Sequence, residues 1–308
     1  MRVVFMGTPA FAVPSLRALA AEHEVALVLT RPDAVRSRGK KLEPSPVKAT
    51  ALELGLPVLE ANRCTPEVLD VLRAADADIF CVAAYGCILP DEVLTMAPLG
   101  CVNVHASLLP RWRGAAPIQR SILAGDAETG VSIMCIGHGV DTGAYCAQAS
   151  CTVAGKTADE LTAELAELGG ELLVRVLPTI ADGTAVWTEQ DESLVTHAAK
   201  ISKAELRLDP NASALDNVRR VLASSDAAPA RCELASKPVR VMMAVEAAKG
   251  AHPAQGEFVI EGKRLFLGCA DGAFEVASLK PDGKREMPAA AWAAGQRERT
   301  GTWSQLIQ

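Results

Sequence analysis

The sequence Ile79-Phe80-Cys81-Val82-Ala83 is a run of five residues without a charged or strongly polar side chain. A strand that is apolar on both faces is typical of a parallel sheet covered by helices on two sides. Comparable runs occur at Val3–Met6, Val25–Leu29, Cys101–Val104 and Val131–Ile136. Helical patterns separate the runs, near Val13–Ala21, Val47–Leu54, Pro66–Ala74, Ile118–Leu123 and Ala158–Ile180. This alternation predicts an α/β domain over residues 1–183 with an open, mostly parallel, Rossmann-like sheet.

The alternation stops after Gly183, and residues 184–207 are largely polar without a clear period, which predicts a linker. Residues 208–308 begin with one short helical stretch, Ala212–Leu222. Strand-sized runs follow at Val239–Val245, Glu257–Ile260, Arg264–Cys269 and Phe274–Leu279. Turn signals such as Asp271-Gly272 separate these runs. We therefore predict a C-terminal, OB-like β-barrel domain over residues 208–308.

Composition limits the class of protein. The 308 residues are 49% hydrophobic and 22% charged, which is typical of a folded globular chain. No apolar run approaches the ~20 residues of a membrane-spanning helix, and the N-terminal run is too short for a signal peptide. The nine cysteines form no C-x-x-C pair, which argues against a disulfide framework and against a thiolate metal site. We expect a cytoplasmic protein without a metal and without a membrane partner.

Charge is unevenly distributed along the chain. The net charge is -6, yet residues 31–48 hold six basic and two acidic residues. Arg36, Arg38, Lys40 and Lys41 lie within six residues of one another in a polar loop. A short charge run is commonly a solvated face, but four cations inside an acidic domain suit contacts with nucleic-acid phosphates.

Asn103 and His105 end the predicted strand that begins at Cys101. Side chains two residues apart on a strand share a face, and binding sites of open sheets lie at the carboxyl ends of the strands. An amide and an imidazole would then address the same atom. The competing interpretation is a histidine satisfied within the core, and this residue pair alone does not exclude it.

Asp141 lies in the sequence Gly137-His138-Gly139-Val140-Asp141-Thr142-Gly143, in which the glycines are typical of a loop that closely contacts a ligand. A plain turn is the other interpretation of this segment. An Asn–His–Asp cluster suits acyl transfer to an amine, because the amide and the imidazole stabilise an oxyanion while the carboxylate holds the imidazole or removes a proton. The sequence contains no serine or cysteine in a nucleophile elbow.

Two common nucleotide motifs are absent. Gly7-Thr8-Pro9-Ala10-Phe11 follows the first strand but lacks the G-x-G-x-x-G spacing, which argues against a nicotinamide-linked dehydrogenase. The phosphate-binding sequence G-x-x-x-x-G-K-[ST] is absent as well. The first turn is better interpreted as a tight connection into a helix with Pro14 in its first turn.

The chain resembles the bacterial methionyl-tRNA formyltransferases along nearly its whole length. The resemblance rests on Gly7-Thr8-Pro9, Arg38–Leu42 with Pro44–Lys48, Ala84-Tyr85-Gly86 with Ile88-Leu89-Pro90, Asn103-Val104-His105, Ser107–Arg120 and Gly139–Gly143. Asn-x-His with Ser-Leu-Leu-Pro marks only the wider group of folate-dependent formyltransferases. Three further features narrow the resemblance from this wider group to the methionyl-tRNA formyltransferases. They are the basic loop, the second domain and the continuation Arg111-Trp112-Arg113-Gly114-Ala115-Ala116-Pro117-Ile118.

The resemblance implies a formyltransferase fold and transfer of a formyl group from 10-formyltetrahydrofolate to methionyl initiator tRNA by a monomer. Asn103, His105 and Asp141 match the catalytic positions. The folate pocket is expected to be lined by Tyr85, Gly86, Cys87, Ile88, Leu89, Pro90, Ser107, Leu108, Leu109, Pro110, Val140 and Thr142. Arg36, Arg38, Lys40 and Lys41 are expected to contact the acceptor end of the tRNA, and the β-barrel its flank.

The sequence departs from the family at two places. Cys87 replaces the usual glutamine or leucine beside the folate pocket, and residues 224–229 replace a characteristic aromatic and proline-rich stretch. Two alternatives share the residues described so far: a folate-dependent formyltransferase acting on a small amine, such as glycinamide ribonucleotide or an amino sugar, and a non-catalytic tRNA-binding protein. The small-amine enzyme needs neither the basic loop nor the second domain.

Overall fold

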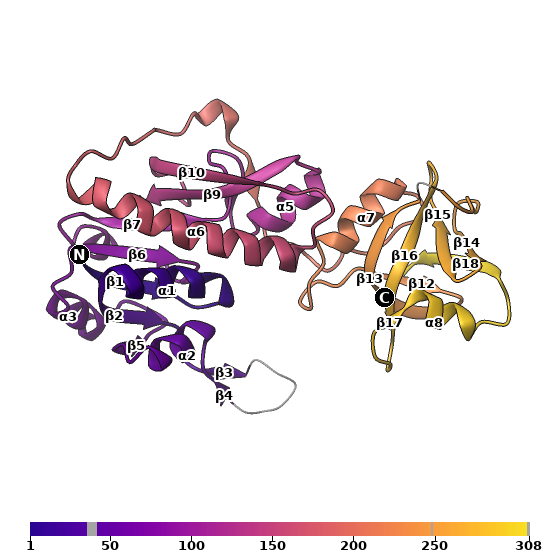
Figure 1. The fold of residues 1–308 in the computed structure, drawn as a ribbon, viewed down its shortest axis with the longest axis horizontal. Helices are drawn as coiled ribbons and strands as arrows, with labels where there is room; N and C mark the ends of the chain where they lie inside the picture. The colour runs from indigo at the N-terminus through magenta and orange to yellow at the C-terminus, as the bar shows by residue number, and fades with distance from the viewer. Residues whose placement is uncertain (36–41, 248, 307–308) are drawn as a thin grey trace. The chain divides into compact units, whose positions relative to one another are not determined.

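The computed structural model describes residues 1–35, 42–247 and 249–306. The chain divides into two compact units. The first unit comprises residues 1–117, 129–151 and 162–198, and the second comprises residues 118–128, 152–161 and 199–308. Each unit is built around a seven-stranded sheet (Figure 1).

The sheet of the first unit has the strand order β10-β9-β7-β6-β1-β2-β5. Its strands are β1 (Arg2–Gly7), β2 (Glu24–Thr30), β5 (Val58–Glu60), β6 (Ile79–Ala83), β7 (Cys101–His105), β9 (Glu128–Cys135) and β10 (Tyr145–Thr152). The five strands β5, β2, β1, β6 and β7 run parallel to one another. β9 runs antiparallel to β7 and places Cys135 opposite Val102. The predicted open, mostly parallel sheet is confirmed.

Helices cover both faces of this sheet. They are α1 (Val13–Glu22), α2 (Pro46–Glu53), α3 (Pro66–Ala74), α4 (Asp91–Leu94) and α6 (Ala158–Ala181), whereas α5 (Pro117–Ala124) falls in the second unit from Ile118 onward. Two adjacent glycines let α6 approach closely: a Cβ atom on Gly169 would lie 2.6 Å from Val104 Cγ1, and one on Gly170 would lie 3.0 Å from the Pro14 carbonyl carbon. Val104 therefore faces α6.

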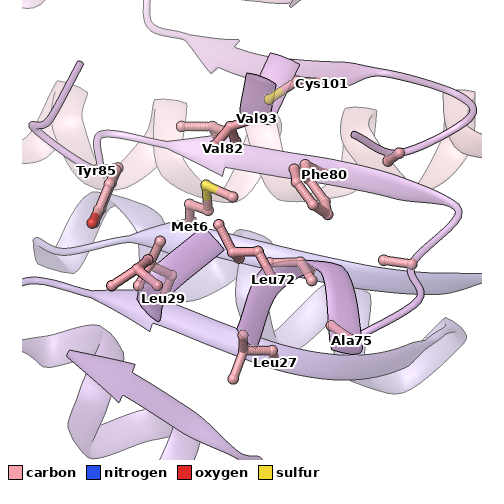
Figure 2. Packing of buried hydrophobic residues seen from close by; sticks show 14 of the residues in the cluster. Met6, Leu27, Leu29, Leu72, Ala75, Phe80, Val82, Tyr85, Val93 and Cys101 are labelled. Carbon is pink, nitrogen blue, oxygen red and sulfur yellow. The ribbon is translucent and has the colours of Figure 1, made fainter. Parts of the chain in front are cut away.

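The opposite face of the sheet packs against α3. Met6, Phe80 and Val82 from the strands meet Leu72 of α3 in one buried cluster (Figure 2). Cys101 of β7 belongs to the same cluster. Because side chains alternate along a strand, Asn103 and His105 lie on the Cys101 face of β7 and away from α6.

Local sequence signals fix the turns around the sheet. α1 begins at Val13 with Pro14 in its first turn, as predicted. Ser45 caps α2 by accepting a hydrogen bond from the Lys48 amide, and Pro46 follows at the first helical position. Gly7 ends β1 where a Cβ atom would lie 2.8 Å from Ala12 Cβ, so the turn requires glycine.

The second unit contains a closed β-barrel. Its strands are β12 (Arg231–Leu234), β13 (Lys237–Glu246), β14 (Glu257–Glu261), β15 (Arg264–Gly268), β16 (Ala273–Pro281), β17 (Met287–Pro288) and β18 (Thr300–Gln305). The order β13-β12-β18-β14-β15-β16-β17 is closed by an antiparallel pairing of β13 with β16. The unit also holds α7 (Ala214–Leu222), capped by Ser213, and α8 (Ala289–Ala294). The predicted helix and β-barrel are confirmed.

Aromatic side chains fill the barrel. Phe258, Phe266, Phe274 and Trp303 are buried, and the Trp303 indole N–H donates to the Gly268 carbonyl over 2.9 Å. The buried polar group of this indole therefore has a hydrogen-bond partner, while its rings pack in the core. Across the described part of both units, no helix combines the length and the apolar character that crossing a membrane requires.

Candidate active site

His105 lies at the end of β7, and Asn103 precedes it by two residues on the same face. The His105 side chain is buried, with 5% of the residue exposed, whereas Asn103 is half-buried. Within the described residues the side-chain amide of Asn103 has no hydrogen-bond partner in the protein. Its N–H groups are therefore available to a ligand.

Asp141 meets His105 from a loop that is remote in the sequence. The Asp141 carboxylate oxygen Oδ2 lies 3.6 Å from His105 Nδ1 and accepts a hydrogen bond of 2.9 Å from the Gly114 amide. Asp141 adopts a left-handed backbone conformation with φ of 53°, which Asp tolerates better than most residues. The structure thus brings together the imidazole and the carboxylate that the sequence singles out.

Both nitrogens of the His105 ring face oxygen atoms. Nδ1 faces the Asp141 carboxylate, and Nε2 lies 3.0 Å from the Trp112 carbonyl oxygen. The Asp141 carboxylate and the Trp112 carbonyl are both acceptors, and together they orient the ring. The His105–Asp141 pair lies next to a side-chain amide that is free to donate.

The loop after β7 is held by internal hydrogen bonds. Ser107 Oγ donates to the Arg111 carbonyl over 2.6 Å, and Ser132 Oγ donates to the Ser107 carbonyl over 2.7 Å. The side chains of Ser107 and Leu109 are buried, while Leu108 and Pro110 are half-buried. Of the predicted pocket residues in this loop, only Leu108 and Pro110 present side chains at the surface.

The segment from Tyr85 to Pro90 follows β6. The Tyr85 side chain turns into the core (Figure 2), where its hydroxyl donates to the Ala61 carbonyl over 2.9 Å and burial raises its pKa. Its own carbonyl accepts from Thr8 Oγ1. A ligand can therefore reach Tyr85 and Gly86 only through the backbone.

Exposed apolar side chains lie on two of the predicted pocket segments. Ile88 is 94% exposed and Val140 is 74% exposed. The two segments lie close together, because His138 Nδ1 is 3.1 Å from the Asp91 carboxylate next to Pro90. Such an apolar surface beside the His105–Asp141 pair suits a planar aromatic ligand.

A polar network that the sequence analysis does not anticipate supports the Asp141 loop. The Gln190 amide nitrogen donates to the carbonyls of Asp141 (2.8 Å) and Gly143 (2.7 Å), and its oxygen accepts from Arg113 Nε (2.8 Å). Glu192 forms a bidentate ion pair with the same guanidinium, which lowers the pKa of its carboxyl group. The predicted linker thus contributes a buried side chain beside the site.

The predicted tRNA contacts Arg36, Arg38, Lys40 and Lys41 lie outside the described residues. The residues that flank them form a short antiparallel ladder, with β3 (Ala34–Val35) paired to β4 (Leu42–Glu43). Lys48 supports the base of this ladder through ion pairs with Asp33 (2.8 Å) and Glu60 (2.9 Å), which raise the pKa of its ammonium group.

Comparisons with known proteins identify the family of the chain. A model of the formyl transferase family matches residues 1–177, and a model described as "Formyl transferase, C-terminal domain" matches residues 200–297. The chain is 46% identical over 294 residues to a protein of Methylococcus capsulatus named methionyl-tRNA formyltransferase, and the match covers 94% of this chain and 95% of that protein.

Solved structures share the fold at low sequence identity. WlaRD, a sugar 3N-formyl transferase, superposes with a TM-score of 0.68 at 15% identity over 92% of this chain and 99% of that chain. HypX from Aquifex aeolicus, solved in complex with tetrahydrofolic acid, superposes with a TM-score of 0.65 at 18% identity over 95% of this chain. The chain spans about half the length of HypX, 47%.

Proposed function

The chain belongs to the formyl transferase family, and we propose that it transfers the formyl group of 10-formyltetrahydrofolate to the α-amine of methionyl initiator tRNA, giving the N-formylmethionyl-tRNA used in translation initiation. The observation that carries the proposal is the free Asn103 amide beside the His105–Asp141 pair, in a chain that matches both family models. The likeness to the Methylococcus capsulatus enzyme supports tRNA as the acceptor, because it extends over both units.

The reaction forms one C–N bond and breaks another. The neutral α-amine attacks the formyl carbon, and the carbonyl oxygen becomes an oxyanion. When the intermediate collapses, the bond between the formyl carbon and N10 breaks. The attacking nitrogen loses one proton and N10 gains one, so that neutral tetrahydrofolate leaves. A free α-amine has a pKa of about 7.7–8.0, and the neighbouring ester lowers it, so an uncharged nucleophile is available near neutral pH. Stabilisation of the oxyanion is then the larger task for the protein.

We assign the oxyanion chiefly to Asn103, because its amide is free whereas both His105 nitrogens face protein oxygens. His105 lies beside Asn103 and assists it at the oxyanion, and Asp141 orients the His105 ring. Fixed donors and charges of this kind stabilise a transition state without reorganisation during the reaction. The backbone after β6, with Cys87, Ile88, Leu89 and Val140, is assigned to the folate, and Arg36, Arg38, Lys40 and Lys41 are assigned to the tRNA.

The experiment that tests the proposal offers three amines separately to the purified protein together with 10-formyltetrahydrofolate. They are methionyl initiator tRNA, methionyl elongator tRNA and glycinamide ribonucleotide. We expect formyl transfer to the initiator tRNA. Transfer to glycinamide ribonucleotide alone would replace the proposal with the small-amine alternative, and binding of tRNA without transfer to any amine would indicate the non-catalytic one.

A further inference from the structure

The segment 188–198 lies between the regions that match the two family models, residues 1–177 and 200–297. It nevertheless contacts both loops that form the site. Thr188 and Tyr145 exchange backbone hydrogen bonds of 2.9 and 3.1 Å, Gln190 reaches the Asp141 loop, and β11 (His197–Ala198) pairs with β8 (Arg113–Gly114). The predicted linker is therefore packed into the first unit along this stretch.

We propose that Gln190 is a positioning residue for formyl transfer, which fixes the Asp141 carboxylate at His105 by holding the backbone of the Asp141 loop. The inference rests on the proposed function, because its expected effect is on kcat for formyl transfer. Its structural basis is independent of that function, because the contacts of Gln190 are with the protein itself.

The hydrogen bonds of Gln190 require a glutamine. Its amide nitrogen donates to two carbonyls while its oxygen accepts from Arg113. The two carbonyls therefore need a donor at this position, and the guanidinium needs an acceptor. A glutamate has no donor for the carbonyls, and an asparagine is one methylene shorter. The residue is 8% exposed, and a carbonyl that loses its partner there is not readily compensated by water.

The other loop is fixed by the same segment. The Arg113 amide donates to the Thr196 carbonyl (2.9 Å), and the Trp112 amide donates to Thr196 Oγ1 (2.9 Å). A Cβ atom on Gly114 would lie 2.9 Å from the Ala198 carbonyl oxygen. Gly114 in turn donates to Asp141, and Trp112 presents its carbonyl to His105, so the segment sets both sides of the His105–Asp141 pair.

Gln190→Glu tests the inference with little change in shape. We expect kcat at saturation with both substrates to fall about ten- to a hundredfold, since misplacing a catalytic group by ~1 Å costs up to about a hundredfold. The KM for the tRNA should change less than kcat, because the substitution lies outside the proposed tRNA contacts. Gln190→Met adds no charge and serves if the glutamate variant does not fold. A folded Gln190→Met protein that keeps the parent kcat would overturn the inference.

Glu192→Gln is the matched control, because it replaces a carboxylate by an amide where Gln190→Glu replaces an amide by a carboxylate. Glu192 binds the same Arg113 guanidinium, from its exposed side. We expect it to keep most of kcat. The double variant Gln190→Glu with Glu192→Gln leaves one carboxylate beside Arg113, as in the parent, but does not replace the two bonds to the Asp141 loop. It should remain as slow as Gln190→Glu. Recovery of kcat in the double variant would show that charge balance at Arg113 matters instead, and would overturn the inference.

Hydrogen–deuterium exchange provides a measurement that does not depend on activity. We expect amides of residues 137–144 to exchange faster in Gln190→Glu and Gln190→Met than in the parent or in Glu192→Gln. If the parent formylates no tRNA but these amides respond as expected, the proposed function fails and the structural role of Gln190 remains. If the parent is active while neither exchange nor kcat responds to Gln190, the inference alone fails.

Discussion

Asp141 shows how the chemistry of the site depends on one residue in an unusual conformation. Its left-handed backbone brings Oδ2 both to the Gly114 amide and to within 3.6 Å of His105 Nδ1. Asparagine also tolerates this conformation, and its amide oxygen accepts the same bond from Gly114. An Asp141→Asn protein therefore keeps the loop but loses the negative charge that faces the ring.

We expect Asp141→Asn to lower kcat about a hundred- to a thousandfold with little change in thermal stability, because its contribution is electrostatic. The measurement is formyl transfer to methionyl initiator tRNA at saturation, alongside the melting temperature of each protein. Glu192→Gln removes a carboxylate from the same unit and is the control for charge. Transfer by Asp141→Asn at the parent rate would remove Asp141 from the mechanism.

At the level of single residues, the sequence predicts which site residues lie together when they belong to the same short segment. Asn103 and His105 share a strand, so their common face follows from the period of two. The chemistry of an Asn–His–Asp cluster and the resemblance to the formyltransferases predict the contact of Asp141 with His105. Gln190 could not be predicted, because it lies in a polar stretch without a period and its partners are backbone carbonyls and Arg113, which are remote in the sequence.

At the level of elements, the apolar runs predict the central strands, because a buried strand needs both faces apolar. The edge strands β5 and β10 are missing from the prediction. β5 has three residues, and β10 consists of half-buried and exposed residues without an apolar run. The reversal of β9 was not predicted either: a buried strand has the same pattern in both directions, and its direction depends on the connection through α5.

The basic loop between β3 and β4 carries a prediction about tRNA. Each phosphate that a protein neutralises on a single strand contributes about 0.7 to the slope of log K against log salt, and on a duplex about 0.9. We expect Arg38→Ala to weaken tRNA binding and to reduce this slope by ~1, with folate binding unchanged. Binding is measured by titration of tRNA at several salt concentrations.

Arg175→Ala is the matched control for the loop, because it removes one exposed cation from α6, the helix that covers the face of β7 opposite Asn103 and His105. Its slope should equal that of the parent. If Arg38→Ala and Arg175→Ala reduce the slope equally, the effect is due to total charge, and the loop has no special contact with the phosphates.

At the level of the whole molecule, each unit has a buried thiol that couples its stability to pH. Cys81 lies in β6 and Cys232 in β12, and burial raises the pKa of each from the ordinary thiol value of 9.0 to about 12. Below pH 9 both thiols are protonated whether the chain is folded or unfolded, so their burial carries no ionisation cost there. Between pH 9 and 12 the unfolded chain loses these protons while the native chain keeps them, which favours unfolding.

We therefore expect the free energy of unfolding to fall by about 1.4 kcal/mol per pH unit for each thiol in this window. Urea unfolding at pH 8 and pH 10 measures the decline, with Cys81→Ala and Cys232→Ala as variants. Each variant starts from a lower stability at pH 8 because it leaves a small cavity, but it should lose less stability than the parent between the two pH values. The other titrating groups are common to all three proteins. Burial and then Cys81 raise the pKa of Cys101, so Cys101 also responds to Cys81→Ala and Cys232→Ala gives the cleaner comparison. Equal declines in the parent and both variants would mean that neither thiol keeps its proton in the folded chain at pH 10, contrary to its burial in β6 or β12.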